Sequence, residues 1–278
     1  MRALLPYQAH LPELVALLGA GFAYLRVTTT RRQRTRGVAG FAALVGVTMW
    51  PVGDLAASVS LTVATVQRLV IVLFVAPMLL LGLSPSTLAR FSRPRPLDAA
   101  SQVVTQPGVA LAIVTVLGTA TLTTPVVDWG ASHDVARDVV LLMVIVVGFV
   151  LWLPALGVMP GTKRLSPTAR AAYVFVSSLV VTSLSFVWIF ARHSLYPGLH
   201  HQQALLGMTP LLDQQLAGFV SKLGCYLPMW AVAFTIFSRA DDQGIPMEDS
   251  PLHWADVERA LLRADRRRAK APRPRGSN

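Results

Sequence analysis

The chain alternates long apolar runs with short polar segments. A helix needs roughly 20 mostly apolar residues to cross the hydrocarbon core of a bilayer, and runs of about that length recur along most of the chain. The pattern predicts an all-α fold, a polytopic membrane helix bundle with seven transmembrane helices. The predicted spans are Leu11–Val27, Val38–Ala56, Leu61–Leu83, Val109–Val127, Val139–Val158, Ala171–Ala191 and Leu211–Phe237.

A polar segment follows the last apolar run. We expect one membrane domain over residues 1–240 and a basic cytoplasmic tail over residues 241–278, which ends in the sequence APRPRGSN. The simplest role for such a tail is to stop transfer and to rest on anionic lipid, where each basic residue contributes about 1 kcal/mol. The alternative is a docking site for a cytoplasmic partner.

Composition supports a membrane protein. Hydrophobic residues make up 53% of the 278 residues and charged residues only 14%, with a mean hydropathy of +0.53, whereas about 25% of an ordinary soluble domain is charged. The single cysteine, Cys225, lies inside the last apolar run. An intramolecular disulfide and a cysteine metal cluster are therefore excluded, and helix packing must hold the fold together.

Positive charges predict the orientation of the bundle. Nearly all of the 25 lysines and arginines lie at or after the ends of the first, third, fifth and seventh spans. The exceptions are Arg2, Arg137 and Arg192 on the opposite side, and Arg68 and Lys222 within spans. By the positive-inside rule the N-terminus is outside and the C-terminus is cytoplasmic, which agrees with an odd number of spans. Nucleic acid is not expected as a partner, because no recognition motif accompanies the charge.

Ionisable groups within spans are candidate functional residues, because each costs roughly 2.5 to 3.5 kcal/mol on insertion scales. Arg68 in the third span and Lys222 in the seventh would lie in the outer half of the bundle, near Asp213, Asp54 and Glu13. We expect the two cations to pair with these acids. A purely structural alternative is that such pairs only fix packing and depth, with long side chains reaching outward to water.

Histidines gather on the predicted outer side. His133, His193, His200 and His201 lie there together with His10, and Met208 on the same side could add a thioether ligand. Imidazole binds copper, zinc, iron and nickel, and a thioether favours Cu(I). The alternative is interfacial histidines without a ligand role, since no pair has the i, i+4 spacing that places two imidazoles on one helix face.

Other chemistry has no support in the sequence. The segment SHDVARD, residues 132–138, contains Ser, His and Asp, but the members of a catalytic triad converge from separate elements. The chain contains no phosphate-binding loop, dinucleotide fingerprint or H-E-x-x-H motif. We therefore expect a protein that is not an enzyme.

Two stretches carry a resemblance to a known family. The third span, TVATVQRLVIVLFVAPMLLLGLSP, and the seventh, MTPLLDQQLAGFVSKLGCYLPMW, resemble the CtaG-like cytochrome c oxidase assembly factors of bacteria, which are seven-helix membrane proteins implicated in providing copper to the oxidase. LYPG at 195–198 and LWLP at 151–154 are also similar to the family, and the resemblance covers roughly residues 38–240. The matching positions are Gln67, Pro77, Gly82 and Pro85 in the third span, and Asp213, Gln214, Gln215 and Gly218 in the seventh.

The departures from the family pattern concern its histidines. Where the resemblance implies an H-x-x-x-H pair in the third span, this chain has Ala64 and Arg68, and at the fifth span it keeps His133 but has Arg137 in place of the partner. A guanidinium has no lone pair to offer a metal. The chain therefore resembles a family member that kept the frame and lost or moved the metal site.

The resemblance implies an assembly or accessory factor for a haem-copper cytochrome c oxidase in the bacterial plasma membrane. Its expected partners are oxidase subunits and membrane lipids, with copper as the candidate metal. We expect a polar cavity open to the outside, lined by Arg68, Asp213, Gln214, Gln215, Lys222, Gln67 and Asp54. It would either pass copper through His133 and the outer-loop histidines or serve only as a docking surface. The alternatives are a small-solute or ion transporter that uses the buried charges, and a receptor or sensor whose output is the basic tail.

Overall fold

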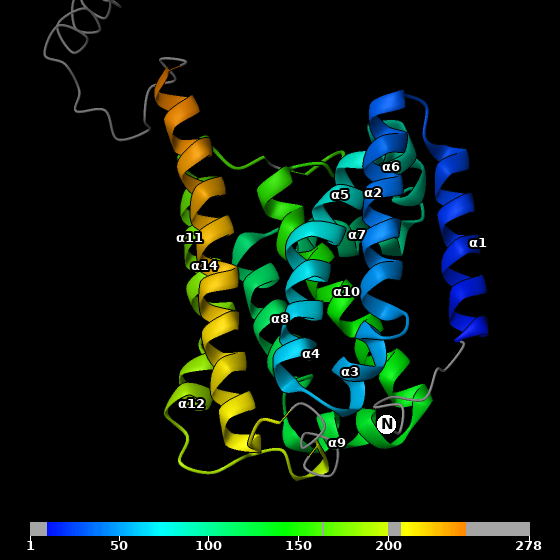
Figure 1. The fold of residues 1–278 in the computed structure, drawn as a ribbon. Coiled ribbons are helices and arrows are strands. Elements are labelled where there is room, and N and C mark those ends of the chain that lie inside the picture. Colours follow the sequence, from blue (N-terminus) through cyan, green and yellow to red (C-terminus); the bar gives the residue numbers. More distant parts are fainter. Residues whose placement is uncertain (1–9, 163, 200–206, 243–278) are drawn as a thin grey trace, which may run out of the picture. The chain divides into compact units, whose positions relative to one another are not determined.

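The chain forms an all-helical structure (Figure 1). The computed structural model describes residues 10–162, 164–199 and 207–242, and no strand occurs in these ranges. The chain divides into two compact units, Met1–Phe237 and Ser238–Asn278, and the predicted tail lies outside the described residues from 243 onward. The elements are α1 Leu11–Val27, α2 Arg31–Thr48, α3 Val52–Ser58, α4 Leu61–Val70, η1 Ile71–Val75, α5 Ala76–Gly82, α6 Pro85–Phe91, α7 Arg95–Val104, α8 Pro107–Ala120, α9 Thr124–Ser132, α10 Asp134–Leu156, α11 Pro167–Val181, α12 Ser185–Phe190, η2 Pro197–Leu199 and α14 Pro210–Asp242.

Four helical stretches among the described residues are long and apolar enough to cross a membrane, and the number rises to six if two bent helix pairs each make one span. The four are Leu61–Gly82, Asp134–Leu156, Pro167–Phe190 and Pro210–Ala240. The all-α prediction and the membrane-spanning helices are thereby confirmed, whereas the count of seven and the orientation stay predictions. The first predicted span, α1, has the predicted bounds and 17 residues, the lower limit for a spanning helix.

One predicted span is bent in the structure, and a second bend lies just before another predicted span. The run predicted over Val38–Ala56 is divided between α2 and α3, which meet at 53°, and α8 is preceded by α7 at 90°. Proline follows each break, Pro51 at the N-cap of α3 and Pro107 at the start of α8. Because proline has no N–H and clashes with the preceding turn, a helix rarely continues through it. The run predicted over Val109–Val127 also ends early, since its last residues belong to α9.

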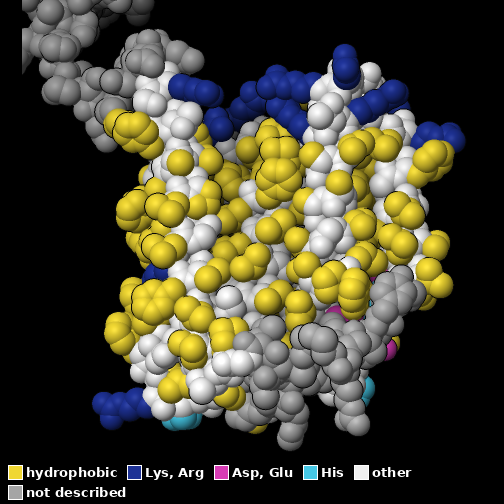
Figure 2. Space-filling view, in the orientation of Figure 1, with side chains coloured by type: hydrophobic (Ala, Val, Ile, Leu, Met, Phe, Trp, Pro, Cys, Tyr) yellow, Lys and Arg dark blue, Asp and Glu magenta, His cyan; other side chains and the backbone are white. Residues whose placement is uncertain are grey.

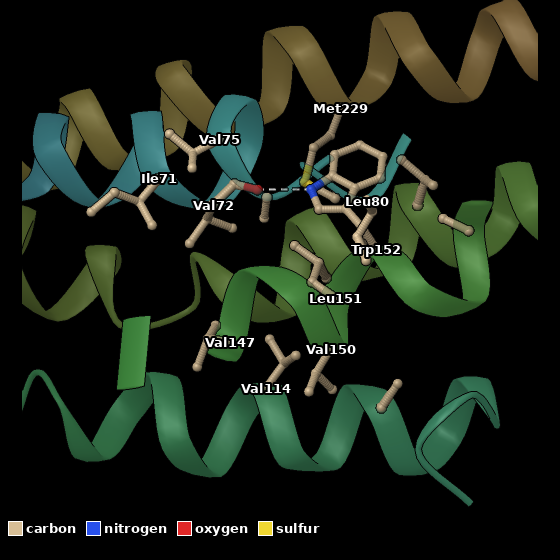
Figure 3. Packing of buried hydrophobic residues seen from close by; sticks show 14 of the residues in the cluster. Ile71, Val72, Val75, Leu80, Val114, Val147, Val150, Leu151, Trp152 and Met229 are labelled. Carbon is tan, nitrogen blue, oxygen red and sulfur yellow. Dashed lines mark hydrogen bonds between the residues drawn. The ribbon is translucent and has the colours of Figure 1, made fainter. Parts of the chain in front are cut away.

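The third predicted span contains a π-helical turn, η1, between α4 and α5. Ala76 N–H donates to the carbonyl of Ile71, an i to i−5 bond. The next such bond would need an N–H from Pro77, which has none. The indole N–H of Trp152 instead donates to the Val72 carbonyl at 2.8 Å (Figure 3). A side chain of α10 thereby satisfies the backbone group that the proline leaves without a donor.

Close packing surrounds this turn. Figure 3 shows Ile71, Val72 and Val75 in the same buried cluster as Leu151 and Trp152. Gly148 of α10 permits the approach, because an added Cβ there would lie 2.8 Å from the Cβ of Ala76 and 3.2 Å from the Cα of Val72. Lipid tails are as apolar as these side chains, so helices in a bilayer associate through such close contacts rather than through exclusion of water.

Charged side chains segregate to the two ends of the bundle. Figure 2 shows lysines and arginines mainly at one end, and acidic and histidine side chains at the other.

Two of the basic residues also donate hydrogen bonds to carbonyls near helix C-termini, where the last carbonyls lack intrahelical donors. Arg36 donates to Leu81 O at 3.0 Å, near the end of α5, and Arg170 donates to Ala155 O at 2.7 Å, near the end of α10. The basic end is the one that the positive-inside rule assigns to the cytoplasm.

Cysteine labelling tests this orientation. In a Cys225→Ser background, a membrane-impermeant maleimide should label Asp134→Cys on intact cells, because Asp134 begins α10 at the acidic end with 86% of its side chain exposed. Arg93→Cys and Thr29→Cys, exposed positions at the basic end, should label only after lysis. An epitope tag before Met1 should bind antibody on intact spheroplasts if α1 spans the membrane. Labelling of Arg93→Cys on intact cells would contradict the orientation.

Candidate functional site

A cavity of about 530 Å³ lies within the membrane unit, a volume in the range of small-molecule sites. Residues of α1, α3, α4, α9 and α10 supply most of its walls. Three of the four positions at which the resemblance implies histidines, Ala64, Arg68 and Arg137, line this one cavity. The fourth, His133, is exposed at the N-cap of α10 and bonds to Ser132. The structure therefore brings the substituted positions together and leaves the retained histidine outside.

A charged network closes the acidic end of the cavity. Arg137 of α10 lies 3.2 Å from Glu13 of α1 and 3.6 Å from both Asp54 of α3 and Asp134. Nε2 of His10 lies 2.8 Å from a carboxylate oxygen of Asp54, and Nδ1 of His10 lies 3.2 Å from a guanidinium nitrogen of Arg137. One oxygen each of Asp54 and Glu13 is buried without a hydrogen-bond partner among the described residues. This network joins α1, α3 and α10.

Arg68 occupies the interior of the cavity, about 10 Å along the helix from the start of α4 at 1.5 Å per residue. Its guanidinium donates to the Thr121 hydroxyl at 2.5 Å and to the Thr121 carbonyl at 3.3 Å. Thr121 is the C-cap of α8, where the helix dipole is equivalent to about half a negative charge. Arg68 therefore caps α8 and is not within salt-bridge distance of an acid in the described part of the chain.

Asp213, in the first turn of α14, binds the N-terminus of α4. The residue is fully buried, and its carboxylate accepts hydrogen bonds from Leu61 N–H at 2.6 Å and Thr62 N–H at 3.2 Å. It also accepts one from the Ser60 hydroxyl at 2.7 Å, and the Thr62 hydroxyl donates back to the Asp213 carbonyl at 2.8 Å. The first N–H groups of a helix lack intrahelical acceptors and carry partial positive charge. A carboxylate from another helix supplies what α4 lacks.

The next two residues bind the connection between α12 and α14. Gln214 is 1% exposed and its side-chain oxygen accepts from Leu195 N–H at 2.8 Å. Gln215 donates to the Ala191 carbonyl at 3.3 Å. In the same connection Tyr196 donates to Leu122 O at 2.7 Å and accepts from the Trp188 indole at 2.9 Å. The three consecutive polar residues of α14 thus each bind the backbone of another segment.

Gly218 allows α14 to lie against α12. A Cβ at this position would be 2.7 Å from Cγ1 of Ile189 and 2.9 Å from the Ser185 carbonyl oxygen, which is too close for any other residue without movement of the backbone. The glycine of the DQQ-x-x-G pattern is therefore required for close packing.

Gln67 and Lys222 also bind within the bundle. Gln67 lines the cavity and donates to Val47 O at 2.7 Å, near the end of α2. Lys222 is 8% exposed, donates to the Tyr226 hydroxyl at 2.8 Å, and its ammonium nitrogen lies 3.4 Å from the centre of the Phe186 ring.

Arg68 and Lys222 do not pair with acids in the described part of the chain, contrary to the expectation from the sequence. Both cations bind uncharged groups, while Asp54 and Glu13 lie beside Arg137. Opposite charge alone could not identify partners that are hydroxyl, carbonyl or aromatic groups.

The predicted metal ligands do not form a cluster in the described part of the chain. His193 is exposed, Met208 precedes α14, and His200 and His201 lie outside the described residues. Across the described ranges no group of three or more His, Cys, Asp or Glu side chains is arranged to hold a metal ion. The cavity offers two guanidinium groups, which have no lone pair for a metal. It is also lined by four side chains that carry possible metal donors, those of His10, Glu13, Met49 and Asp138, and the first two are already bonded to Arg137.

Sequence reasoning missed the network of His10, Asp54 and Arg137 as a unit. The signal was present, since these residues and Glu13 all fall on the predicted outer side and carry opposite charges. The sequence analysis assumed instead that the acids would pair with the two cations within the spans, Arg68 and Lys222. Glu13 and Asp54 lie near helix ends, so their side chains can contact Arg137 at the start of α10 more easily than Arg68, which lies two turns inside α4.

Comparison with known proteins gives one match. The family model described as cytochrome c oxidase caa3 assembly factor matches residues 19–241. No curated protein and no solved structure matches the chain.

Replacement of Asp213 tests its structural role. Asp213→Asn keeps the volume but turns an NH₂ group towards donors of Ser60, Leu61 or Thr62. Loss of charge-assisted bonds and a buried mismatch should lower the free energy of unfolding in mixed detergent micelles by about 2 kcal/mol or more. The control Asp134→Asn changes a carboxylate whose side chain is 86% exposed, and should change stability by less than about 1 kcal/mol. Equal stability of the two variants would refute the role given to Asp213.

Proposed function

Because this chain belongs to the cytochrome c oxidase caa3 assembly factor family, we propose that it is a non-enzymatic factor that assists assembly of a haem-copper oxidase in the bacterial plasma membrane. The observation that carries the proposal is the family match over residues 19–241, which includes α2 to α12 and nearly all of α14. The expected partners are subunits of that oxidase and the surrounding lipid.

The arrangement of the signature residues supports a docking role. Asp213, Gln214 and Gln215 hold the ends of α4 and α14 and the 191–195 segment together through buried hydrogen bonds. Such a frame is stiff, so it can present a defined surface to a partner at low entropic cost. Asp134, with 86% of its side chain exposed at this end, adds a charge that can select a complementary partner.

No copper step is assigned to the cavity. Arg68 and Arg137 line it and neither can ligate a metal, and the charge of Arg68, which no acid among the described residues pairs with, repels a metal cation. The proposed role on the oxidase is therefore that of a docking and assembly surface.

The basic end supports placement against the cytoplasmic leaflet. Its arginines lie together at one end of the membrane unit (Figure 2), and the anionic lipids of that leaflet attract each nearby basic residue by about 1 kcal/mol. This contact would hold the unit at a fixed depth while the opposite end meets the oxidase.

Complementation of a deletion strain tests this function. Membranes that lack the chain should lose cytochrome c oxidase activity and the haem absorbance of the assembled oxidase, and the wild-type chain should restore both. A variant with His133, His193, His200 and His201 all replaced by alanine should also restore them, since docking does not need these ligands. Asp213→Asn should restore less, in proportion to its reduced amount in the membrane.

Copper supplementation separates docking from copper provision. Excess copper in the medium should not rescue the deletion strain under the docking proposal. Rescue by copper, together with failure of the four-histidine variant, would replace docking by copper provision. Unchanged oxidase in the deletion strain would overturn the assembly role itself.

A further inference from the structure

Arg68 carries a charge that its protein partners offset only in part. It donates two hydrogen bonds, both to Thr121, whereas a guanidinium has five N–H donors. The C-terminus of α8 contributes the equivalent of about half a negative charge, and no acid among the described residues lies within 4.0 Å of Arg68. Arg68 is half-buried and lines the cavity. A cation that is partly withdrawn from water without a full counter-charge is unfavourable, so this position favours a bound anion.

Arg137 is different, although it lines the same cavity. Glu13, Asp54 and Asp134 all lie within 3.6 Å of it, so its charge is already matched. Glu13 and Asp138 also line the cavity, and these carboxylates disfavour a small free anion that arrives from water. The attraction for an anion is therefore greatest at Arg68, inside the cavity.

The walls of the cavity are mainly apolar, and part of the lining reaches the outer surface of the bundle. Leu61, Ile71, Val144 and Ile145 are among the apolar residues that line it. Leu142 of α10 lines the cavity and is 60% exposed, and Ala16 of α1 lines it and is also exposed. The cavity thus opens towards the bilayer between α1 and α10, which gives an apolar molecule a route from the membrane.

We propose that this cavity binds a single-chain anionic amphiphile from the bilayer, with its acidic head group at Arg68 and its apolar chain along the walls between α1 and α10. The head group is a carboxylate or a phosphate monoester, either of which accepts charge-assisted hydrogen bonds from a guanidinium. The volume of about 530 Å³ is in the range of sites for ligands of this size. This activity goes beyond oxidase assembly and does not depend on it.

Equilibrium binding of radiolabelled laurate tests the proposal. The full chain, in phosphatidylcholine nanodiscs, should bind laurate saturably with one molecule per chain. Dodecanol, which has the same chain and no charge, should bind more weakly, and millimolar acetate, which has the charge and no chain, should not compete. Competition by acetate as effective as that by unlabelled laurate would replace the amphiphile by a small-anion site and overturn the proposal.

Matched variants locate the site. Arg68→Gln should weaken laurate binding by about tenfold or more, since charge-assisted hydrogen bonds are roughly twice as strong as neutral ones. Lys222→Gln removes a buried cation that does not line the cavity, and should leave binding unchanged. Ala64→Leu fills part of the cavity and leaves the bonds of Arg68 to Thr121 in place, so it should also weaken binding and serves if Arg68→Gln does not fold. Equal laurate binding by wild type and a folded Arg68→Gln or Ala64→Leu variant would refute the site.

Discussion

The structure depends on the carboxylate of Asp213 at the N-terminus of α4. This buried group joins two helices that are about 150 positions apart in the chain, through main-chain N–H groups of Leu61 and Thr62. A helix terminus without acceptors is costly inside a membrane, where no water can replace them. The bond therefore determines where α4 begins, and with it the position of Gln67 and Arg68 along the cavity.

The same principle recurs at the other signature residues. Trp152 supplies a donor to the Val72 carbonyl that Pro77 leaves without one, Gln67 supplies a donor near the end of α2, and Gln214 accepts from Leu195. In each case a side chain satisfies a backbone group that has no partner within a regular helix, at a π-helical turn, near a helix end or in a connection. The residues that carry the resemblance thus make structural hydrogen bonds in the described part of the chain.

Hydropathy predicted the helical membrane fold because spanning length is a property of a local run of residues. It could not predict the π-helical turn or the bends at Pro51 and Pro107, because these depend on the packing and hydrogen bonds that neighbouring helices supply to the interrupted backbone.

The residues of the candidate site were predicted in part. Arg68, Gln67 and the positions of the missing histidines were named, but Asp213 was expected to pair with a side-chain cation. Its partners among the described residues are instead a hydroxyl and main-chain N–H groups, which charge counting does not reveal.

The chain belongs to the cytochrome c oxidase caa3 assembly factor family, and its cavity is lined by two arginines. This combination favours an assembly role that relies on contact with the oxidase. Affinity purification of the tagged full chain from its native membranes in mild detergent tests that role most directly, with an unrelated tagged membrane protein of equal abundance as control. The account predicts that oxidase subunits are enriched over the control, both for the wild-type chain and for the variant that lacks the four outer histidines. Absence of oxidase subunits from the wild-type eluate would contradict it.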